Sequence, residues 1–325
     1  MVERDEILGT IRAFYGREAG DETEVAQLEA RNFEDAIELS QSLVNSPEFV
    51  ARFYGRLDPS PYMMPAVYKE QQIDCEATDA QLDKLLSRIQ GEWEEFGRTE
   101  PHWSVLTSEQ FKQDSIASNE DEFFGSGAHV LNLIRSLLER QGMDLSSLDT
   151  CFELGCGVGR ITIHLAEAFK HVIAADISRF HLEICDKELL KRQVGNVRLN
   201  LLDSPYAVRN LPDFDFFCSF IVLQHNPPPV MTFLLDAILG KLRPGGVAVF
   251  QLPVAILGYR FDLDHYLDAP DEPHMEMHVL PQTHLLRVLA RNGCRLLEIR
   301  EDGWIGARDR SISNTVFAIK DGVPN

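Results

Sequence analysis

The segment Cys-Phe-Glu-Leu-Gly-Cys-Gly-Val-Gly-Arg, residues 151–160, constrains this chain of 325 residues more than any other. A short apolar run ends at Glu153 and Leu154, three glycines follow at alternate positions, and a helical pattern occupies 161–169. Glycine has no Cβ, so the backbone turns tightly and approaches a ligand closely. The helix that follows presents free N–H groups to the same ligand. The pattern therefore predicts a strand, a loop that binds a small-molecule cofactor, and a helix.

The composition is that of a folded protein with an acidic surface. Apolar residues make up 44% of the chain and charged residues 25%, with 51 acidic against 31 basic side chains and a net charge of −20. Nucleic acids and anionic membranes require a basic surface. We therefore expect neither nucleic acid nor a membrane as a partner.

The N-terminus and the cysteines bear on the expected compartment. The first residues, Met-Val-Glu-Arg-Asp-Glu, lack the apolar core of a signal peptide, and no apolar run approaches the roughly 20 residues that span a bilayer. The six cysteines are scattered, with no Cys-x-x-Cys pair. Scattered cysteines inside apolar patterns are typical of a reducing compartment, so a cytoplasmic location is expected.

From Thr150 onward, strand and helix patterns alternate. Strands are predicted at 150–154, 171–176, 196–202, 214–222 and 247–252, and helices at 160–169, 179–192 and 228–239. This alternation predicts a parallel sheet with helices on both faces, an α/β fold. A helix at 281–292 and strands at 295–300 and 314–320 complete the chain. Since no helix separates the last two strands, they are predicted to form an antiparallel hairpin.

The first part of the chain has helical spacing instead. Ile7, Leu8, Ile11 and Phe14 recur at helical intervals, with breaks at 16–20 and 58–61 and a further helix at 78–96. We expect a helical N-terminal domain at 1–115, serving as a lid, in acceptor recognition or in oligomerisation, and an α/β domain at 116–325. The stretch 253–280 is longer than a simple connection and is expected to be an insertion.

Two further acidic residues follow predicted strands. Asp176 ends the second strand, 21 residues after Gly155, and Asp203 follows the third strand. A carboxylate at the end of the second strand accepts hydrogen bonds from the hydroxyls of a ribose. The alternative is a turn or a helix cap, and Ser178 is itself a plausible N-cap.

Glu153-Leu154-Gly155-Cys156-Gly157-Val158-Gly159, then Asp176, Asp203 and Leu-Arg-Pro-Gly-Gly at 242–246, resemble a class I S-adenosylmethionine-dependent methyltransferase over residues 125–325. The resemblance implies a Rossmann-like, mostly parallel seven-stranded sheet and S-adenosylmethionine as cofactor. It further implies that Glu153 and the loop lie against the methionine part, that Asp176 holds the ribose, and that Ile177, Leu202 and Asp203 border the adenine. The residues expected to bind the cofactor are Glu153, Gly155, Cys156, Gly157, Gly159, Arg160, Asp176, Ile177, Leu202, Asp203, Phe220 and Gln224.

A dinucleotide-binding dehydrogenase is the competing interpretation. Its loop reads G-x-G-x-x-G, but Arg160 stands where the last glycine is needed. Glu153 would also repel a pyrophosphate, whereas it favours a cofactor with an ammonium and a sulfonium group. The motif therefore favours S-adenosylmethionine.

The segment after the fourth strand reads Phe-Ile-Val-Leu-Gln-His-Asn-Pro-Pro-Pro, residues 220–229. Ligands of open α/β sheets bind at the carboxyl ends of strands, so Gln224 and His225 are expected at the cleft. His225 is a candidate general base, with a structural role as the alternative.

The expected insertion contains His274, Glu276 and His278, which alternate and so share one face of an extended segment. Three such ligands could hold a metal, but contact with substrate is the more common use of this pattern, and no metal is predicted. His278 is a second candidate acid or base.

These observations predict a methyltransferase that uses S-adenosylmethionine to methylate a hydroxyl of a small molecule or glycan. The chain resembles bacterial methyltransferases of surface-polysaccharide type, which implies the glycan as an acceptor. The alternatives are methylation of a small amine, or a non-catalytic protein that binds the cofactor and a partner. Homo-oligomerisation is left open.

Overall fold

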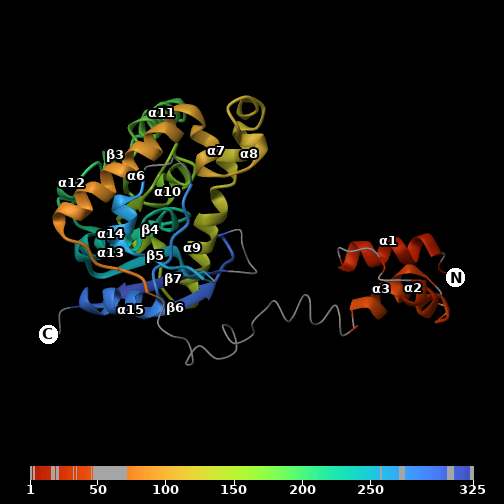
Figure 1. The fold of residues 1–325 in the computed structure, drawn as a ribbon. Coiled ribbons are helices and arrows are strands. Elements are labelled where there is room, and N and C mark those ends of the chain that lie inside the picture. Colours follow the sequence, from red (N-terminus) through yellow and green to blue (C-terminus); the bar gives the residue numbers. More distant parts are fainter. Residues whose placement is uncertain are drawn as a thin grey trace. The chain divides into compact units, whose positions relative to one another are not determined.

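A computed structural model describes residues 2, 4–15, 19, 22–31, 33, 35–44, 46, 72–256, 258–270, 275–305 and 311–322. The chain divides into two compact units, Met1–Gln71 and Gln72–Asn325 (Figure 1). Among the helices that the structure describes, none combines the length and the apolar character that crossing a bilayer requires.

The first unit contains three helices, α1 (Arg4–Tyr15), α2 (Glu22–Glu29) and α3 (Ala36–Val44). Asp35 begins α3, because its Oδ1 accepts hydrogen bonds from the N–H groups of Ile37 and Glu38, both at 2.9 Å. The helical character predicted for this part is confirmed in its described residues; the predicted break at 58–61 lies outside them. Apolar side chains from all three helices form a core of their own together with Phe33, which lies between α2 and α3; the helical members are Ile7, Ile11, Val25, Leu28, Leu39 and Leu43.

The second unit is built on a seven-stranded sheet with the order β3-β2-β1-β4-β5-β7-β6. Neighbouring strands run parallel except for β7, which is antiparallel to both β5 and β6. The predicted mostly parallel sheet with a terminal antiparallel hairpin is thus confirmed. The strands are β1 (Thr150–Leu154), β2 (His171–Asp176), β3 (Val197–Leu201), β4 (Phe214–Ser219), β5 (Leu242–Ile256), β6 (Cys294–Glu301) and β7 (Ser311–Lys320).

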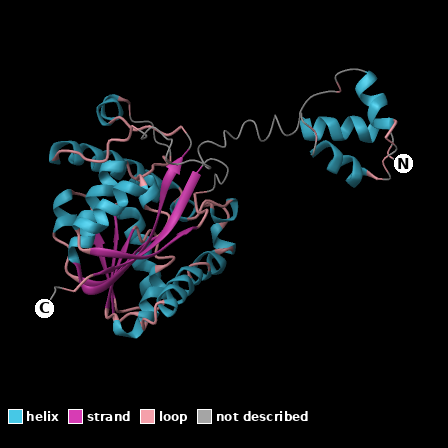
Figure 2. Cartoon of the chain, turned by 90° about the horizontal axis from the view of Figure 1, so that it is seen from below, coloured by secondary structure: helices cyan, strands magenta, loops and turns pink. Residues whose placement is uncertain are grey.

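Helices cover both faces of the sheet (Figure 2). They are α6 (Asp79–Thr99), α7 (Pro101–Val105), α8 (Glu120–Gly125), α9 (Ala128–Arg140), α10 (Thr162–Ala168), α11 (Arg179–Lys191), α12 (Pro205–Arg209), α13 (Pro228–Lys241), α14 (Leu263–Asp268) and α15 (Gln282–Arg291). Short 3₁₀ helices occupy Glu109–Phe111, Ile116–Ser118, Leu145–Ser147 and Leu223–His225.

Alternate residues of each strand face opposite sides of the sheet. Phe152 and Phe217 pack in one core with α6, α13 and α15, whereas their neighbours Cys151 and Phe216 pack in another with α9 and α10. Strands buried on both faces read as continuous apolar runs, which is the pattern of β1 and β4.

The division between the two units falls before α6, whereas the sequence pattern predicts a domain boundary at residue 115. α6 begins at a capping box, in which Thr78 and Gln81 bond to each other's backbone N–H. Its buried residues Leu82, Leu85, Leu86 and Ile89 join the core of the sheet. Residues 72–115 therefore pack with the α/β fold.

Candidate functional site

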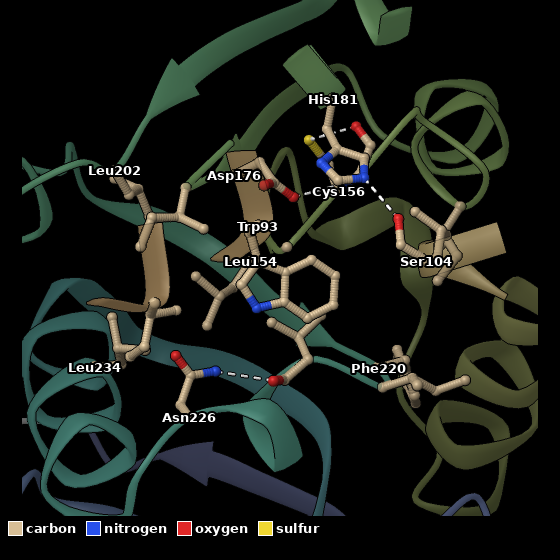
Figure 3. Close-up of a pocket in the computed structure, with 18 of the residues that line it drawn as sticks. Trp93, Ser104, Leu154, Cys156, Asp176, His181, Leu202, Phe220, Asn226 and Leu234 are labelled. Carbon is tan, nitrogen blue, oxygen red and sulfur yellow. Dashed lines mark hydrogen bonds between the residues drawn. The ribbon is translucent and has the colours of Figure 1, made fainter. Parts of the chain in front are cut away.

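A pocket with an empty volume of about 850 Å³, its mouth included, lies where β1 and β2 end and where the segments after β3 and β4 begin. Figure 3 shows most of the residues that line it. The pocket is lined by Leu86, Ile89, Trp93, Ser104, Val105, Leu154, Gly155, Cys156, Gly157, Arg160, Ile161, Asp176, Ile177, His181, Leu202, Phe220, Ile221, Val222, Asn226 and Leu234.

The glycine loop forms one wall of this pocket. The N–H groups of Gly155 and Cys156 both donate to the carbonyl oxygen of Ala175 on β2, at 2.7 and 3.0 Å. Gly155 has φ +73°, and a Cβ there would lie 2.3 Å from Cγ2 of Val222. Only glycine combines this conformation with this close approach, so the loop motif is explained by local geometry.

Asp176 ties this loop to the end of β2. Its Oδ2 accepts a hydrogen bond from the N–H of Gly157 at 2.8 Å, and its Oδ1 accepts one from the N–H of Ser178 at 2.9 Å. Ser178 in turn caps α11 by accepting from the N–H of His181, as predicted. The carboxylate thus has a fixed position on the pocket wall.

Glu153 precedes the glycine loop and Arg160 follows it, and the two side chains differ in their position relative to the pocket. Glu153 is not among the lining residues; it is buried, it accepts a hydrogen bond from Oγ1 of Thr162 at 2.6 Å, and burial raises its pKa to about 7. Arg160 lines the pocket and donates from Nη1 to Oγ of Ser126 at 3.2 Å. Its buried Nε has no hydrogen-bond partner among the residues described. An anionic group in the pocket would satisfy this nitrogen.

The structure gathers most of the predicted cofactor residues around the pocket. Gly159 and Asp203 are not among its lining residues. Gly159 has φ +92°, and a Cβ there would lie 2.9 Å from Sγ of Cys185, so packing explains this glycine. Asp203 is exposed, one residue beyond the pocket wall. The predicted residues that do line the pocket are Gly155, Cys156, Gly157, Arg160, Asp176, Ile177, Leu202 and Phe220.

Gln224 and His225 lie in a buried polar chain behind the wall. Nδ1 of His225 donates to the carbonyl oxygen of Glu276 at 2.9 Å, so Nε2 is left to accept from the side-chain amide of Gln224 at 3.2 Å. Oε1 of Gln224 accepts from Gln251, whose own Oε1 accepts from the N–H of Ile221. Burial lowers the pKa of His225 to about 4. The ring is therefore neutral, with both nitrogens engaged inside the protein.

The same chain supports a strained residue of the pocket. Ile221 has φ +61°, a conformation that is rare for a β-branched residue. Its N–H donates to Gln251 at 2.9 Å. This bond stabilises the turn that follows β4, where Phe220, Ile221 and Val222 line the pocket.

His278 lies in a second cluster. Its Nε2 bonds to Oε2 of Glu276 at 2.7 Å and its Nδ1 to the hydroxyl of Tyr259 at 2.7 Å. Tyr266 also donates to Oε2 of Glu276, at 2.6 Å. None of these residues lines the pocket. His274, the third member of the alternating pattern, lies outside the described residues.

Sequence reasoning missed the wall built by α6, α7 and α11. Oγ of Ser104 and Nε2 of His181 are hydrogen-bonded at 2.9 Å, and burial lowers the pKa of His181. The apolar face of the predicted helix 78–96 was the available signal for α6. The lining residues that were not predicted to bind the cofactor are Leu86, Ile89, Trp93, Ser104, Val105, Leu154, Ile161, His181, Ile221, Val222, Asn226 and Leu234.

Comparison with known proteins agrees with this architecture. Residues 152–246 match a family model described as a methyltransferase domain. The cypemycin N-terminal methyltransferase of a Streptomyces species is 35% identical over 103 residues, 30% of this chain and 40% of that protein. A probable cobalt-precorrin-6B C(15)-methyltransferase of Methanothermobacter thermautotrophicus is 30% identical over 99 residues, 30% of this chain and 49% of that protein. The chain thus spans less than half the length of either curated relative.

The fold has a counterpart among solved structures. The magnesium protoporphyrin IX methyltransferase of Synechocystis, crystallised with bound S-adenosylhomocysteine, superposes with a TM-score of 0.51 at 17% identity, covering 74% of this chain and 100% of that one. At this identity the likeness concerns the fold, and it agrees with the strand order and the family match. Residues 152–246 are therefore a methyltransferase domain, and the sheet that contains them has the Rossmann-like fold of class I methyltransferases.

Proposed function

We propose that this protein binds S-adenosylmethionine in the described pocket and transfers its methyl group to a hydroxyl of a small molecule or glycan. The observation that carries the proposal is the shared wall of Gly155, Gly157 and Asp176, in which the loop and the acid at the end of β2 are hydrogen-bonded to each other. The family match over residues 152–246 supports it.

The residues present fit this cofactor. The carboxylate of Asp176 would accept the ribose hydroxyls, and the apolar side chains of Ile177 and Leu202 would border the adenine. Arg160 would pair with the carboxylate of the methionine part, since its Nε lacks a partner among the described residues. Glu153 would act from behind the loop on the ammonium group. For Asp203, which is exposed and is not among the lining residues, a contact with the adenine amine stays a prediction.

When bound, the cofactor supplies an electrophilic methyl group on a sulfonium. The chain's own contribution is to align the acceptor with this carbon and to exclude water, which an apolar, helix-covered pocket achieves. A hydroxyl or amine acceptor also loses a proton in the reaction. That His225 or His278 accepts this proton stays a prediction. The engaged nitrogens and the low pKa of His225 favour a positioning role over that of a base.

Methylation of an amine is the second candidate. It is supported by the similarity to the cypemycin N-terminal methyltransferase, whose name denotes an amine acceptor. For the acidic helices of residues 1–71 we propose a part in acceptor recognition or in homo-oligomerisation. A cytoplasmic location stays a prediction, resting on the scattered cysteines, all six of which are free thiols.

Calorimetric titration with S-adenosylmethionine and, separately, with NAD⁺ tests the cofactor. We expect binding of the former alone. Isotope-labelled methyl transfer to panels of hydroxyl and amine acceptors then tests the reaction. Binding of NAD⁺ alone would overturn the proposal, and labelled amines without labelled hydroxyls would favour the second candidate.

A further inference from the structure

Trp93 of α6 lies within the pocket, although no cofactor motif includes it. Figure 3 shows its indole in the middle of the view, with Leu202 and Leu234 on one side and Ser104 and Phe220 on the other. Trp93 is neither fully buried nor exposed, so part of the ring is free to meet a ligand.

Three neighbouring rings hold the indole. Its centroid lies 5.6 Å from that of Phe96, 6.2 Å from that of His181 and 5.4 Å from that of His225, each at a tilted angle. Burial lowers the pKa of both histidines, so both are neutral at neutral pH. The indole is therefore fixed in orientation and has no cationic ring beside it.

The charged residues of the pocket wall offer little attraction to a positive ligand group. Arg160 is cationic and repels a positive ligand group. Asp176 is the only acidic side chain among the described lining residues, and each of its oxygens already accepts a backbone N–H. The carboxylate of Glu153 lies behind the loop. A positive group in the middle of this pocket thus meets mainly apolar and aromatic surface.

We propose that the indole of Trp93 faces the positive sulfonium of the cofactor, so that the pocket distinguishes the charged cofactor from its neutral demethylated product. The inference rests on the proposed function. The sulfonium lies between the adenosine and the amino-acid end of the cofactor. Trp93 lines the same pocket as the residues expected to hold those two ends, which are Leu202 and Ile177 for the adenosine and the loop with Arg160 for the amino acid. Tryptophan is the side chain whose ring attracts a cation most strongly.

This contact makes product release easier. Loss of the methyl group removes the positive charge, and with it the attraction to the indole. The pocket therefore weakens its hold on the product without any movement of the protein.

Calorimetric titrations with S-adenosylmethionine and S-adenosylhomocysteine test the inference in the full-length wild type and in Trp93→Leu, Trp93→Phe, Ile89→Ala and Phe220→Leu. Trp93→Leu is expected to weaken binding of the charged ligand about tenfold more than that of the neutral one. Trp93→Phe keeps an aromatic face and is expected to retain most of the preference. Ile89→Ala removes apolar wall from the same helix and is expected to weaken both ligands equally. Circular dichroism confirms that each variant is folded.

The possible outcomes distinguish a failure of the inference from a failure of the proposed function. If the wild type binds neither ligand, the proposed function fails. If it binds both and Trp93→Leu weakens them by the same factor, the function stands and the inference is wrong. A selective loss in Phe220→Leu instead of Trp93→Leu also overturns the inference, since it places the sulfonium at the other aromatic wall.

Discussion

Oδ2 of Asp176 accepts a hydrogen bond from the N–H of Gly157 at 2.8 Å, so the acid that ends β2 fixes the glycine loop that follows β1. The two residues stand 19 positions apart in the sequence and form one corner of the pocket. Asp176 thus has two positions of interest in one side chain: its oxygens hold the loop, and its carboxylate lines the pocket.

Asp176→Asn should weaken S-adenosylmethionine binding by about 10- to 100-fold, because hydrogen bonds to a charged group contribute about 1.5–3 kcal/mol each. Calorimetric titration measures the effect. Asp213→Asn, at an exposed acid before β4, is the matched control and should bind like the wild type. Equal affinity of Asp176→Asn and the wild type would remove the ribose assignment.

Glu153→Gln should increase stability at pH 8. Burial raises the pKa of Glu153 from 4.5 to about 7, so the folded state keeps a proton that the unfolded state has lost. The free energy of unfolding therefore falls as the pH rises through this window, by about 3 kcal/mol in full. Glutamine does not titrate, so the free energy of unfolding of Glu153→Gln should not fall in this way as the pH rises.

Urea unfolding at pH 4 and at pH 8 measures the difference. The free energy of unfolding of Glu153→Gln should exceed that of the wild type at pH 8, and the two should be nearly equal at pH 4. Glu139→Gln, at an exposed position of α9, should show no such dependence. An advantage of the same size at both pH values would show that ionisation of Glu153 is not its cause.

His225→Gln should lose less stability in acid than the wild type. Burial lowers the pKa of His225 from 6.5 to about 4, so between these values the unfolded state binds the proton and the folded state does not. The contribution of His225 to the free energy of unfolding is fully present above pH 6.5, and it falls by about 3 kcal/mol as the pH drops through 4. Unfolding measured from pH 7 to pH 4 tests this, with the exposed His171→Gln as control. Parallel curves for the wild type and His225→Gln would contradict the low pKa.

Gly97→Ala and Gly91→Ala form a matched pair on α6. A Cβ at Gly97 would lie 2.6 Å from Oγ of Ser178 and 2.8 Å from Nδ1 of His181, whereas nothing lies within 4 Å of a Cβ at Gly91. Gly91→Ala should therefore stabilise the protein by up to about 1 kcal/mol through helix propensity. Gly97→Ala should destabilise it by about 1–3 kcal/mol, since it separates α6 from α11.

Thermal unfolding of both variants, together with S-adenosylmethionine titration, measures this packing. Gly97→Ala should also bind the cofactor less tightly, because Trp93 and His181 both line the pocket. If the two alanine variants were equally stable, the close approach of α6 to α11 would be wrong.

The local patterns of the sheet could be predicted because each strand has its own signal. β1 and β2 begin and end where the apolar runs do, and β7 was identified as antiparallel because no helix precedes it. The glycine loop and Asp176 were identified by their places at strand ends, and both line the pocket.

The rest of the site depends on packing between distant segments. Trp93 and Ser104 lie 50 residues or more before the loop, and a helical pattern predicts which face is buried but not against what. The roles of His225 and His278 could not be predicted for the same reason, because the sequence around a histidine is the same whether its ring faces a ligand or a buried polar group. For His225 the difference comes from the backbone carbonyl of Glu276, 51 positions later, which accepts a hydrogen bond from Nδ1.

The most direct test of the central claim is a crystal structure of the protein with S-adenosylhomocysteine. The account predicts the ligand in the pocket between α6 and the glycine loop, with its ribose hydroxyls about 3 Å from the carboxylate of Asp176. A ligand bound elsewhere, or a ribose without contact to Asp176, would contradict it.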